Sequence, residues 1–199
     1  ALERRLGDSR EVIRTIVEKA KTDPRRIVFP EGTQNKILQA CKILKEEGVA
    51  HPILLGREAE IRSVADKLGV NLDGITLEDP EASSRTKSYI QELFKLRQRK
   101  GVTLKEAEEL ILDPNVFGAM MVHKGDADGL VSGLTHHYPD TIRPALQIIG
   151  TRDDVNHVSG LYIMIIKNRA YFFSDTTVNI TPDAEVLAEI TLESARLVR

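Results

Sequence analysis

Short runs of consecutive apolar residues alternate with longer segments of helical apolar spacing along the first part of the chain. The runs predict buried strands at residues 26–29, 52–56 and 74–77. The longer segments predict helices at residues 8–23, 37–48 and 57–68. Strands that alternate with helices of this length are typical of a parallel sheet with right-handed crossovers. We therefore expect an α/β fold, a parallel sheet with helices on both faces.

The middle of the chain is mostly helical, and a polar connection at residues 150–154 separates it from two further strand-like runs. Thr103 and Glu106 form the sequence pattern of a capping box. The expected helices and strand of this block lie at residues 84–98, 103–111, 116–123, 129–131 (the strand) and 141–149. Beyond the connection we expect strands at residues 158–166 and 170–174, a turn at 167–169, and a last helix with Thr181 as N-cap and Pro182 at its first position. The domains predicted are a linker with an opening helix at 1–24, a first α/β domain at 25–150 and the beginning of a second at 151–199.

The segment from Gly125 to Pro144 holds most of the candidate chemistry. A short apolar strand runs into the Ser132–Gly133 turn, and a polar loop leads to the helix expected at residues 141–149. A strand, a small-residue loop and a helix N-terminus together present backbone N–H groups to an anion. Arg143, within the expected first turn, adds a planar bidentate donor. The spacing therefore predicts a phosphate or acyl-phosphate site.

Each of these residues also has a purely structural interpretation. Arg143 could be solvated and paired with Asp140, and Ser132–Gly133 could form only a tight turn. His136 and His137 are adjacent, so their side chains diverge in most loop geometries. No Cys or further well-spaced His accompanies them, and we set a zinc site aside. A general-base role needs a partner that orients the ring, and the sequence does not show one.

Candidates outside this segment have similar alternatives. Asp126 and Asp128 are either paired carboxylates or part of a polar loop before a strand. Asp175 and Asn179 follow an apolar strand, where α/β proteins gather ligand sites, although turn and cap duty is the commoner role. Arg97 lies near a helix end, where a solvated cation suits the helix dipole. The sequence leaves these alternatives open.

Composition narrows the class of protein. The chain has 199 residues, 41% of them hydrophobic and 29% charged, as in an ordinary globular protein. A net charge of −2 argues against non-specific nucleic-acid binding, which needs a basic surface. The single cysteine, Cys41, fits a reducing compartment, and no apolar run suggests a membrane span, so we expect a cytoplasmic protein. Both ends look like cuts in a longer polypeptide, because the chain starts with Ala1 and ends within an expected helix.

Several long motifs resemble the phosphate acetyl/butyryltransferase (phosphotransacetylase) family. They follow one another in the family's order over nearly the whole chain. The motifs are Arg26–Gly32, Leu96–Thr103, Asp113–Val122, Gly125–Gly133, Asp140–Ile149 and Phe173–Asn179. The resemblance implies a two-domain α/β architecture with the ligand between the domains, the second domain being truncated here.

The resemblance also implies ligands and roles. The resemblance implies that acetyl-CoA, CoA and acetyl phosphate are the ligands. It also implies that the protein forms a homo-oligomer. It matches Arg97 and Arg143 to arginines that bind phosphate or CoA, and it places the thiol-activating aspartate beyond Arg199. We expect no metal site and no catalytic residue within this segment. Spacing and resemblance together give these ligand-binding candidates: Arg97, Ser132, Gly133, Thr135, His136, Asp140, Thr141, Arg143, Asp175 and Asn179.

A second resemblance leads to two hypotheses about function. Residues 6–26 and 187–192 resemble bacterial hybrid NADP-dependent malic enzymes, and Tyr138–Pro139 would crowd an acetyl phosphate pocket. The first hypothesis is a regulatory, acetyl-CoA-binding domain of such a malic enzyme, with NADP and a divalent metal only in the absent N-terminal part. The alternative is a fragment of an active phosphate acetyltransferase, which converts acetyl-CoA and phosphate to acetyl phosphate and CoA.

Overall fold

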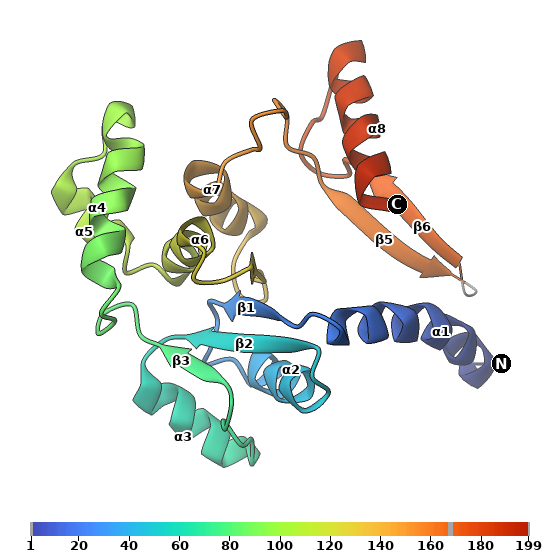
Figure 1. Cartoon of the computed structure of the whole chain (residues 1–199), viewed down its shortest axis with the longest axis horizontal. Helices are drawn as coiled ribbons and strands as arrows, with labels where there is room; N and C mark the ends of the chain where they lie inside the picture. The colour runs from blue at the N-terminus through green and yellow to red at the C-terminus, as the bar shows by residue number, and fades with distance from the viewer. Residues whose placement is uncertain (1, 167–168, 199) are drawn as a thin grey trace. The chain divides into compact units, whose positions relative to one another are not determined.

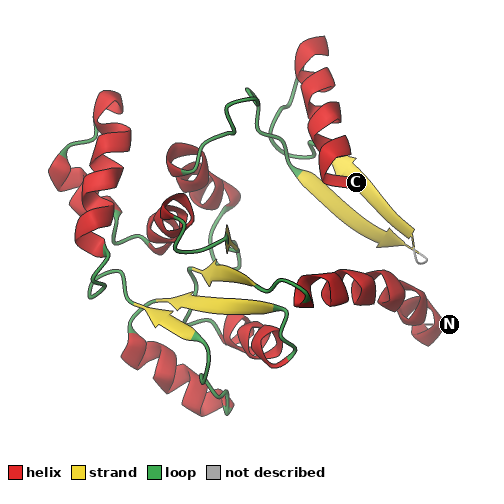
Figure 2. Ribbon diagram, in the orientation of Figure 1, coloured by secondary structure: helices red, strands yellow, loops and turns green. Residues whose placement is uncertain are grey.

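The computed structural model describes residues 2–166 and 169–198, and of residues 2–11 it describes the backbone alone. The chain divides into two units (Figures 1 and 2). One unit is Ala20–Gly150, and the other combines Ala1–Lys19 with Thr151–Arg199. The first helix, α1 (Leu2–Lys21), ends just before the first strand.

The unit of residues 20–150 is built on a four-stranded sheet. The strands are β1 (Arg25–Phe29), β2 (Ala50–Leu55), β3 (Thr76–Glu78) and β4 (Gly129–Leu130), and their order is β3-β2-β1-β4. Every neighbouring pair is parallel, and Val28 lies opposite Ile53 on one side and Leu130 on the other. The predicted parallel sheet is confirmed.

Helices cover both faces of this sheet (Figure 1). They are α2 (Asn35–Glu46), α3 (Glu58–Leu68), α4 (Thr86–Arg97), α5 (Leu104–Leu110), α6 (Pro114–Lys124) and α7 (Tyr138–Ile148), with a short 3-10 helix, η1 (Gln98–Lys100). Successive strand side chains point to opposite faces. Phe29 and Leu54 therefore pack with α2 and α3, whereas Val28 and Leu55 pack with α4 to α7.

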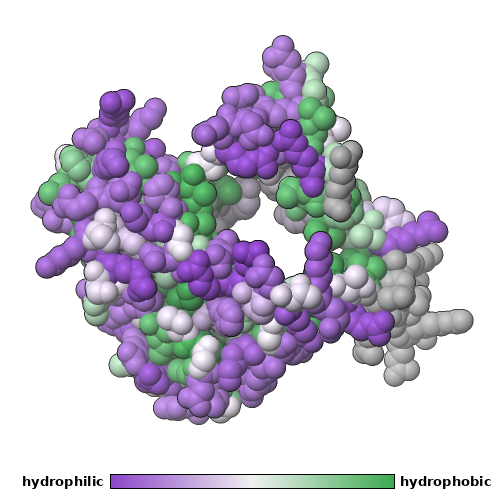
Figure 3. Space-filling model, in the orientation of Figure 1, coloured by the Kyte–Doolittle hydropathy of each residue, from purple (hydrophilic) through white to green (hydrophobic). Residues whose placement is uncertain are grey.

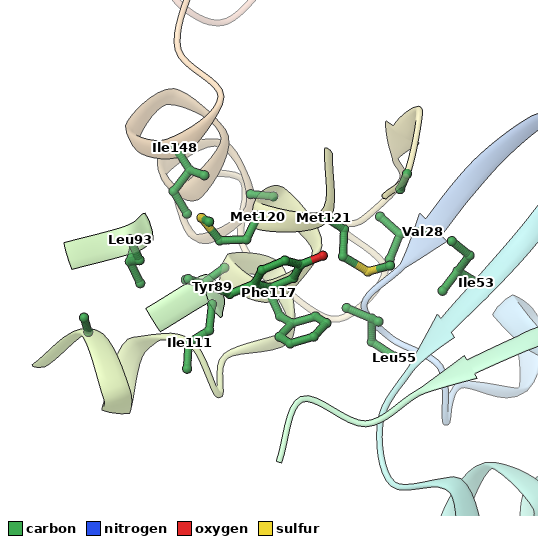
Figure 4. Close-up of a cluster of buried hydrophobic side chains, with 14 residues drawn as sticks. Val28, Ile53, Leu55, Tyr89, Leu93, Ile111, Phe117, Met120, Met121 and Ile148 are labelled. Carbon is green, nitrogen blue, oxygen red and sulfur yellow. The ribbon is translucent and has the colours of Figure 1, made fainter. Parts of the chain in front are cut away.

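The core on the second face gathers around α6, in which the seven consecutive residues Asn115–Met121 are buried. Figure 4 shows Phe117, Met120 and Met121 of this helix between the strands and the side chains of α4 and α7. The rings of Tyr89 and Phe117 lie 5.1 Å apart, centroid to centroid, in a tilted arrangement. A helix that is apolar all round is buried all round, and α6 is the central element of this core.

Local sequence signals fix several helix ends as predicted. Gly69 ends α3 in the left-handed conformation, with φ 63°. Thr103 and Glu106 make the reciprocal bonds of a capping box at the start of α5. Asp113 caps α6 by accepting two backbone N–H bonds, and Pro114 takes the first turn, so α6 begins two residues before the predicted start.

Three predicted helix starts are wrong. The opening helix begins at Leu2 and not at residue 8. The helix expected at residues 141–149 begins at Tyr138, because Pro139 fits the first turn, where no N–H donor is needed. The last helix, α8 (Ala184–Val198), begins after Thr181 and Pro182. Its capping oxygen comes from Asp183, which accepts from the N–H of Val186.

The second unit contains an antiparallel hairpin, β5 (Leu161–Ile166) and β6 (Arg169–Ser174), with α8 packed on β6. Most of the predicted turn at residues 167–169 lies outside the described residues. Large apolar side chains of both strands are exposed, and Figure 3 shows hydrophobic surface over this hairpin. Within the described part of the chain, no helix is both long enough and apolar enough to cross a membrane.

Candidate functional site

The candidate site lies where two loops meet at the carboxyl edge of the sheet. The chain runs from β1 to β2 and β3 on one side, and then returns to place β4 on the other side of β1. The β1–α2 loop (residues 30–34) and the β4–α7 loop (residues 131–137) therefore leave adjacent parallel strands in different directions. Such a topological switch point is where open α/β sheets bind ligands.

Glu31, in the β1–α2 loop, holds the β4–α7 loop through five hydrogen bonds. Its Oε2 accepts from the N–H groups of Gly133 and Leu134, at 3.3 and 3.0 Å. Its Oε1 accepts from the N–H of Thr135 at 2.5 Å and from the Thr135 hydroxyl at 2.7 Å. The fifth partner is Nδ1 of His136, 3.0 Å from Oε1. One carboxylate thus joins two loops that are about a hundred residues apart in sequence.

Glu31 is ionised in this setting although its side chain is only 2% exposed. Burial by itself raises the pKa of Glu31. The hydrogen bonds from Thr135, Leu134 and His136 favour the charged form more strongly and lower the pKa to about 2. A buried carboxylate is tolerated because its oxygens are fully hydrogen-bonded.

Backbone N–H groups converge where the sequence predicts an anion site, but they donate to the protein's own Glu31 carboxylate. Gly133 has φ 119°, a conformation that glycine adopts readily, and consecutive N–H groups converge as in an anion-binding nest. We expected these N–H groups to be free for phosphate. The structure corrects that expectation, because the Glu31 carboxylate already accepts from all of them.

Two further polar side chains of the candidate list lie at or beside this loop. The hydroxyl of Ser132 donates to Oδ1 of Asn115, which is 1% exposed at the start of α6. The hydroxyl of Thr141, on α7, is shielded from solvent and has no hydrogen-bond partner among the described residues. A shielded hydroxyl without a partner is unusual in a folded protein.

The guanidinium groups of the two candidate arginines have no protein partner in the described part of the chain. Arg143 is exposed and lies in the second turn of α7, so its predicted place in a first helical turn is wrong. The alternative pairing of Arg143 with Asp140 is absent among the described residues, where Asp140 sits in the first turn of α7. Arg97 is half-buried in the last turn of α4. Both guanidinium groups therefore remain candidates for an anionic ligand.

Asp175 and Asn179 serve their own turn, in the other unit. The Asp175 carboxylate accepts from the N–H groups of Val178 and Asn179, and the Asn179 amide donates to the carbonyl of Val158. Asp175 has φ 47°, which aspartate tolerates in turns. A cavity of about 320 Å³ lies beside these residues. Asp175 and Asn179 therefore stabilise a turn, and a role for them in ligand binding stays a prediction.

Asp126 and Asp128 each have a separate partner within the protein. Asp128 forms a bidentate ion pair with Arg26, at 2.7 and 3.0 Å, which lowers the pKa of Asp128. Asp126 accepts from the hydroxyl of Tyr89. Burial of Cys41 raises the pKa of its thiol to about 12, so the thiolate is scarce at neutral pH. The described residues hold no group of three or more His, Cys, Asp or Glu side chains that could bind a metal ion.

Sequence reasoning missed Glu31 and Asn115. Glu31 stands in the sequence analysis only within the Arg26–Gly32 motif, although it lies two residues after a buried parallel strand, a position that favours ligand sites. Its partnership with residues 133–136 depends on β4 lying next to β1, and the order of strands is not written in the local pattern. Asn115 gave no signal beyond its place after a helix cap.

The fold and the site together define an α/β protein with a polar switch-point site at the carboxyl edge of an open parallel sheet. The family model for phosphate acetyl/butaryl transferase matches residues 11–199. This chain belongs to that family. The expected family and α/β class are confirmed.

Curated relatives and solved structures agree with this assignment. The phosphate acetyltransferase of Bacillus subtilis is 42% identical over 93% of this chain and 57% of its own length. That of Nitratidesulfovibrio vulgaris is 41% identical over 92% of this chain and 26% of its own length. The EutD phosphotransacetylase from Staphylococcus aureus, a solved structure, matches with a TM-score of 0.87 at 37% identity, over 94% of this chain and 57% of its own. The chain therefore spans about half, or less, of the length of these relatives.

The first hypothesis about function is wrong. Three relatives that each match more than nine-tenths of the chain, from Nitratidesulfovibrio vulgaris, Bacillus subtilis and Thermoanaerobacterium thermosaccharolyticum, are phosphate acetyltransferases. The malic-enzyme hypothesis relied partly on crowding by Tyr138–Pro139. The structure places this pair in the first turn of α7, with Tyr138 50% exposed. The NADP and divalent metal inferred for a malic-enzyme part have no support.

Proposed function

We propose that this chain is part of a phosphate acetyltransferase, which transfers an acetyl group between CoA and inorganic phosphate. The observation that carries the proposal is 42% identity to the Bacillus subtilis phosphate acetyltransferase across 93% of this chain. The topological switch point supports it, because open α/β sheets bind their ligands at that edge. The ligands proposed are acetyl-CoA, CoA, acetyl phosphate and phosphate.

In the proposed reaction the sulfur of CoA attacks the carbonyl carbon of acetyl phosphate, and phosphate leaves. The negative charge that develops on the transferring group needs fixed donors. Arg143 is the donor that we propose for the phosphate, because it is exposed and lies in the second turn of the helix that follows the β4–α7 loop, and its guanidinium lacks a partner among the described residues. Arg97 and the hydroxyl of Thr141 are proposed as further contacts to the ligand.

Substitution of Arg143 tests the proposal. The assay measures acetyl-CoA formation from acetyl phosphate and CoA. It uses the purified full-length polypeptide of which we propose this chain is part. Arg143→Gln should raise the KM for acetyl phosphate about 10- to 100-fold, the value of one charge-assisted hydrogen bond of about 1.5–3 kcal/mol. Arg62→Gln is the matched control, because Arg62 pairs with Glu58 on α3, on the other face of the sheet. Absence of acetyl transfer by the unaltered protein would overturn the proposed function.

We also propose that the protein is cytoplasmic and forms a homo-oligomer, as the family resemblance implies. The exposed apolar side chains of the β5–β6 hairpin, such as Tyr162 and Phe173, support an assembly. Sedimentation velocity over a range of protein concentrations measures the assembly state. A monomer throughout that range would refute this part of the proposal.

A further inference from the structure

A carboxylate and an imidazole form a pair at the carboxyl edge of β1 and β4. Oε1 of Glu31 lies 3.0 Å from Nδ1 of His136, and the two side chains are 2% and 34% exposed. The carboxylate is thus enclosed while the ring reaches the surface. A general-base histidine needs a partner that orients its ring, and the fold supplies that partner from a loop that precedes it by about a hundred residues.

The contacts of Glu31 determine which nitrogen of the ring is left for a ligand. An ionised carboxylate only accepts hydrogen bonds, so Nδ1 of His136 must carry a hydrogen. In the neutral ring the other nitrogen, Nε2, then holds the free lone pair. Nε2 has no hydrogen-bond partner among residues 2–166 and 169–198, so it is free to accept a proton or a hydrogen bond.

The β4–α7 loop that carries His136 is held by the same carboxylate that contacts the ring. The same carboxylate accepts from the backbone of the three residues that precede His136. The ring and its supporting backbone are therefore fixed by one anchor. Catalytic groups require such fixed rotamers, because a displacement of about 1 Å costs a large part of the rate.

We propose that His136 transfers a proton to and from the phosphate group of the ligand, and that Glu31 is the positioning residue that orients its ring. This inference rests on the proposed acetyltransferase function. When monohydrogen phosphate attacks acetyl-CoA, an oxygen–carbon bond forms and the carbon–sulfur bond breaks. The phosphate proton passes to Nε2, and CoA leaves as the thiolate. Release of that proton to water restores the neutral ring, and the thiolate takes up a proton separately. In the reverse direction the imidazolium protonates the departing phosphate.

Two substitutions of His136 separate a proton-transfer role from a structural one. His136→Asn keeps an N–H donor where Nδ1 contacts Glu31 but removes Nε2. It should therefore leave the free energy of unfolding almost unchanged and lower kcat roughly a hundredfold or more, the usual contribution of a proton-transfer group. His137→Asn is the matched control, because His137 is adjacent and exposed and its side chain makes no cap bond. A kcat of His136→Asn equal to that of the unaltered protein would overturn the inference and leave the proposed function standing.

The role of Glu31 has its own readouts. Glu31→Gln should lower kcat, and the double variant with His136→Asn should be no slower than the slower single variant, because both act through one ring. Long-range proton–nitrogen NMR of the chain should show His136 with hydrogen on Nδ1, and a mixture of tautomers in Glu31→Gln. Inorganic phosphate should shift the Nε2 signal of the unaltered chain. A proton on Nε2 instead of Nδ1, or no phosphate-dependent shift, would overturn the inference even if the chain transferred no acetyl group.

Discussion

At the scale of single residues, the Glu31 carboxylate links the position of the site to the stability of the fold. The buried carboxylate accepts five hydrogen bonds, so this one side chain contributes strongly to the free energy of unfolding. Its pKa falls from 4.5 to about 2 on folding. Since about 1.4 kcal/mol corresponds to one pKa unit, the ionised form adds about 3 kcal/mol to the free energy of unfolding.

This contribution has a defined pH dependence. A group whose pKa is lowered on folding stabilises the protein fully above its unfolded pKa, and the effect is lost as the pH falls through the folded pKa. The free energy of unfolding should therefore exceed that of Glu31→Gln by about 3 kcal/mol at pH 7, and the difference should shrink between pH 4.5 and about 2. Urea denaturation of both proteins at several pH values measures it. A difference that does not vary with pH would show that Glu31 acts through shape and not through charge.

At the scale of elements, local sequence signals predict where helices begin and end, whereas the order of strands in the sheet decides which loops meet. The end of α3 at Gly69 and the capping box of α5 need only neighbouring residues, and the sequence alone predicts both. The start of α7 was misplaced because Asp140 and Thr141 resemble caps, while Pro139 fits the first turn equally well. The bond between Glu31 and the β4–α7 loop depends on which strand lies beside β1, and no local pattern encodes that neighbour.

The Asp113 cap of α6 should make a measurable contribution to the free energy of unfolding. Asp113 satisfies two N–H groups of the most buried helix in the core. Asp113→Ala should lower the free energy of unfolding by about 1–2 kcal/mol, the usual cost of a lost cap. Asp140→Ala in the first turn of α7 is the control, because Asp140 makes no capping hydrogen bond among the described residues and should cost less than about 0.5 kcal/mol. Equal losses in the two variants would contradict the capping role of Asp113.

At the scale of the whole molecule, the two units differ in how they bury apolar residues. The unit of residues 20–150 contains both clusters of buried hydrophobic side chains. In the other unit, described apolar residues of β5 and β6 are half-buried or exposed. Stability in this chain is therefore expected to reside mainly around α6 and the parallel sheet.

Substitution of one phenylalanine in each unit compares how much the two units contribute to stability. Phe117 is fully buried beside Tyr89, and Phe172 on β6 is 40% exposed. Phe117→Ala should lower the free energy of unfolding by about 3–5 kcal/mol, because it removes a core ring and leaves a cavity. Phe172→Ala should cost about 1 kcal/mol or less. Denaturant unfolding curves of the two variants measure both values, and a greater loss for Phe172→Ala would contradict this distribution of stability.

The central claim is that the carboxyl edge of β1 and β4 receives the phosphate group of the ligand. The most direct test maps backbone amide shifts of the chain by NMR as acetyl phosphate is added, with acetate at equal ionic strength as the control. The largest phosphate-specific shifts should fall in residues 30–34 and 131–143, around Glu31, His136 and Arg143. Shifts confined to the turn at residues 175–180, or no difference from acetate, would contradict it.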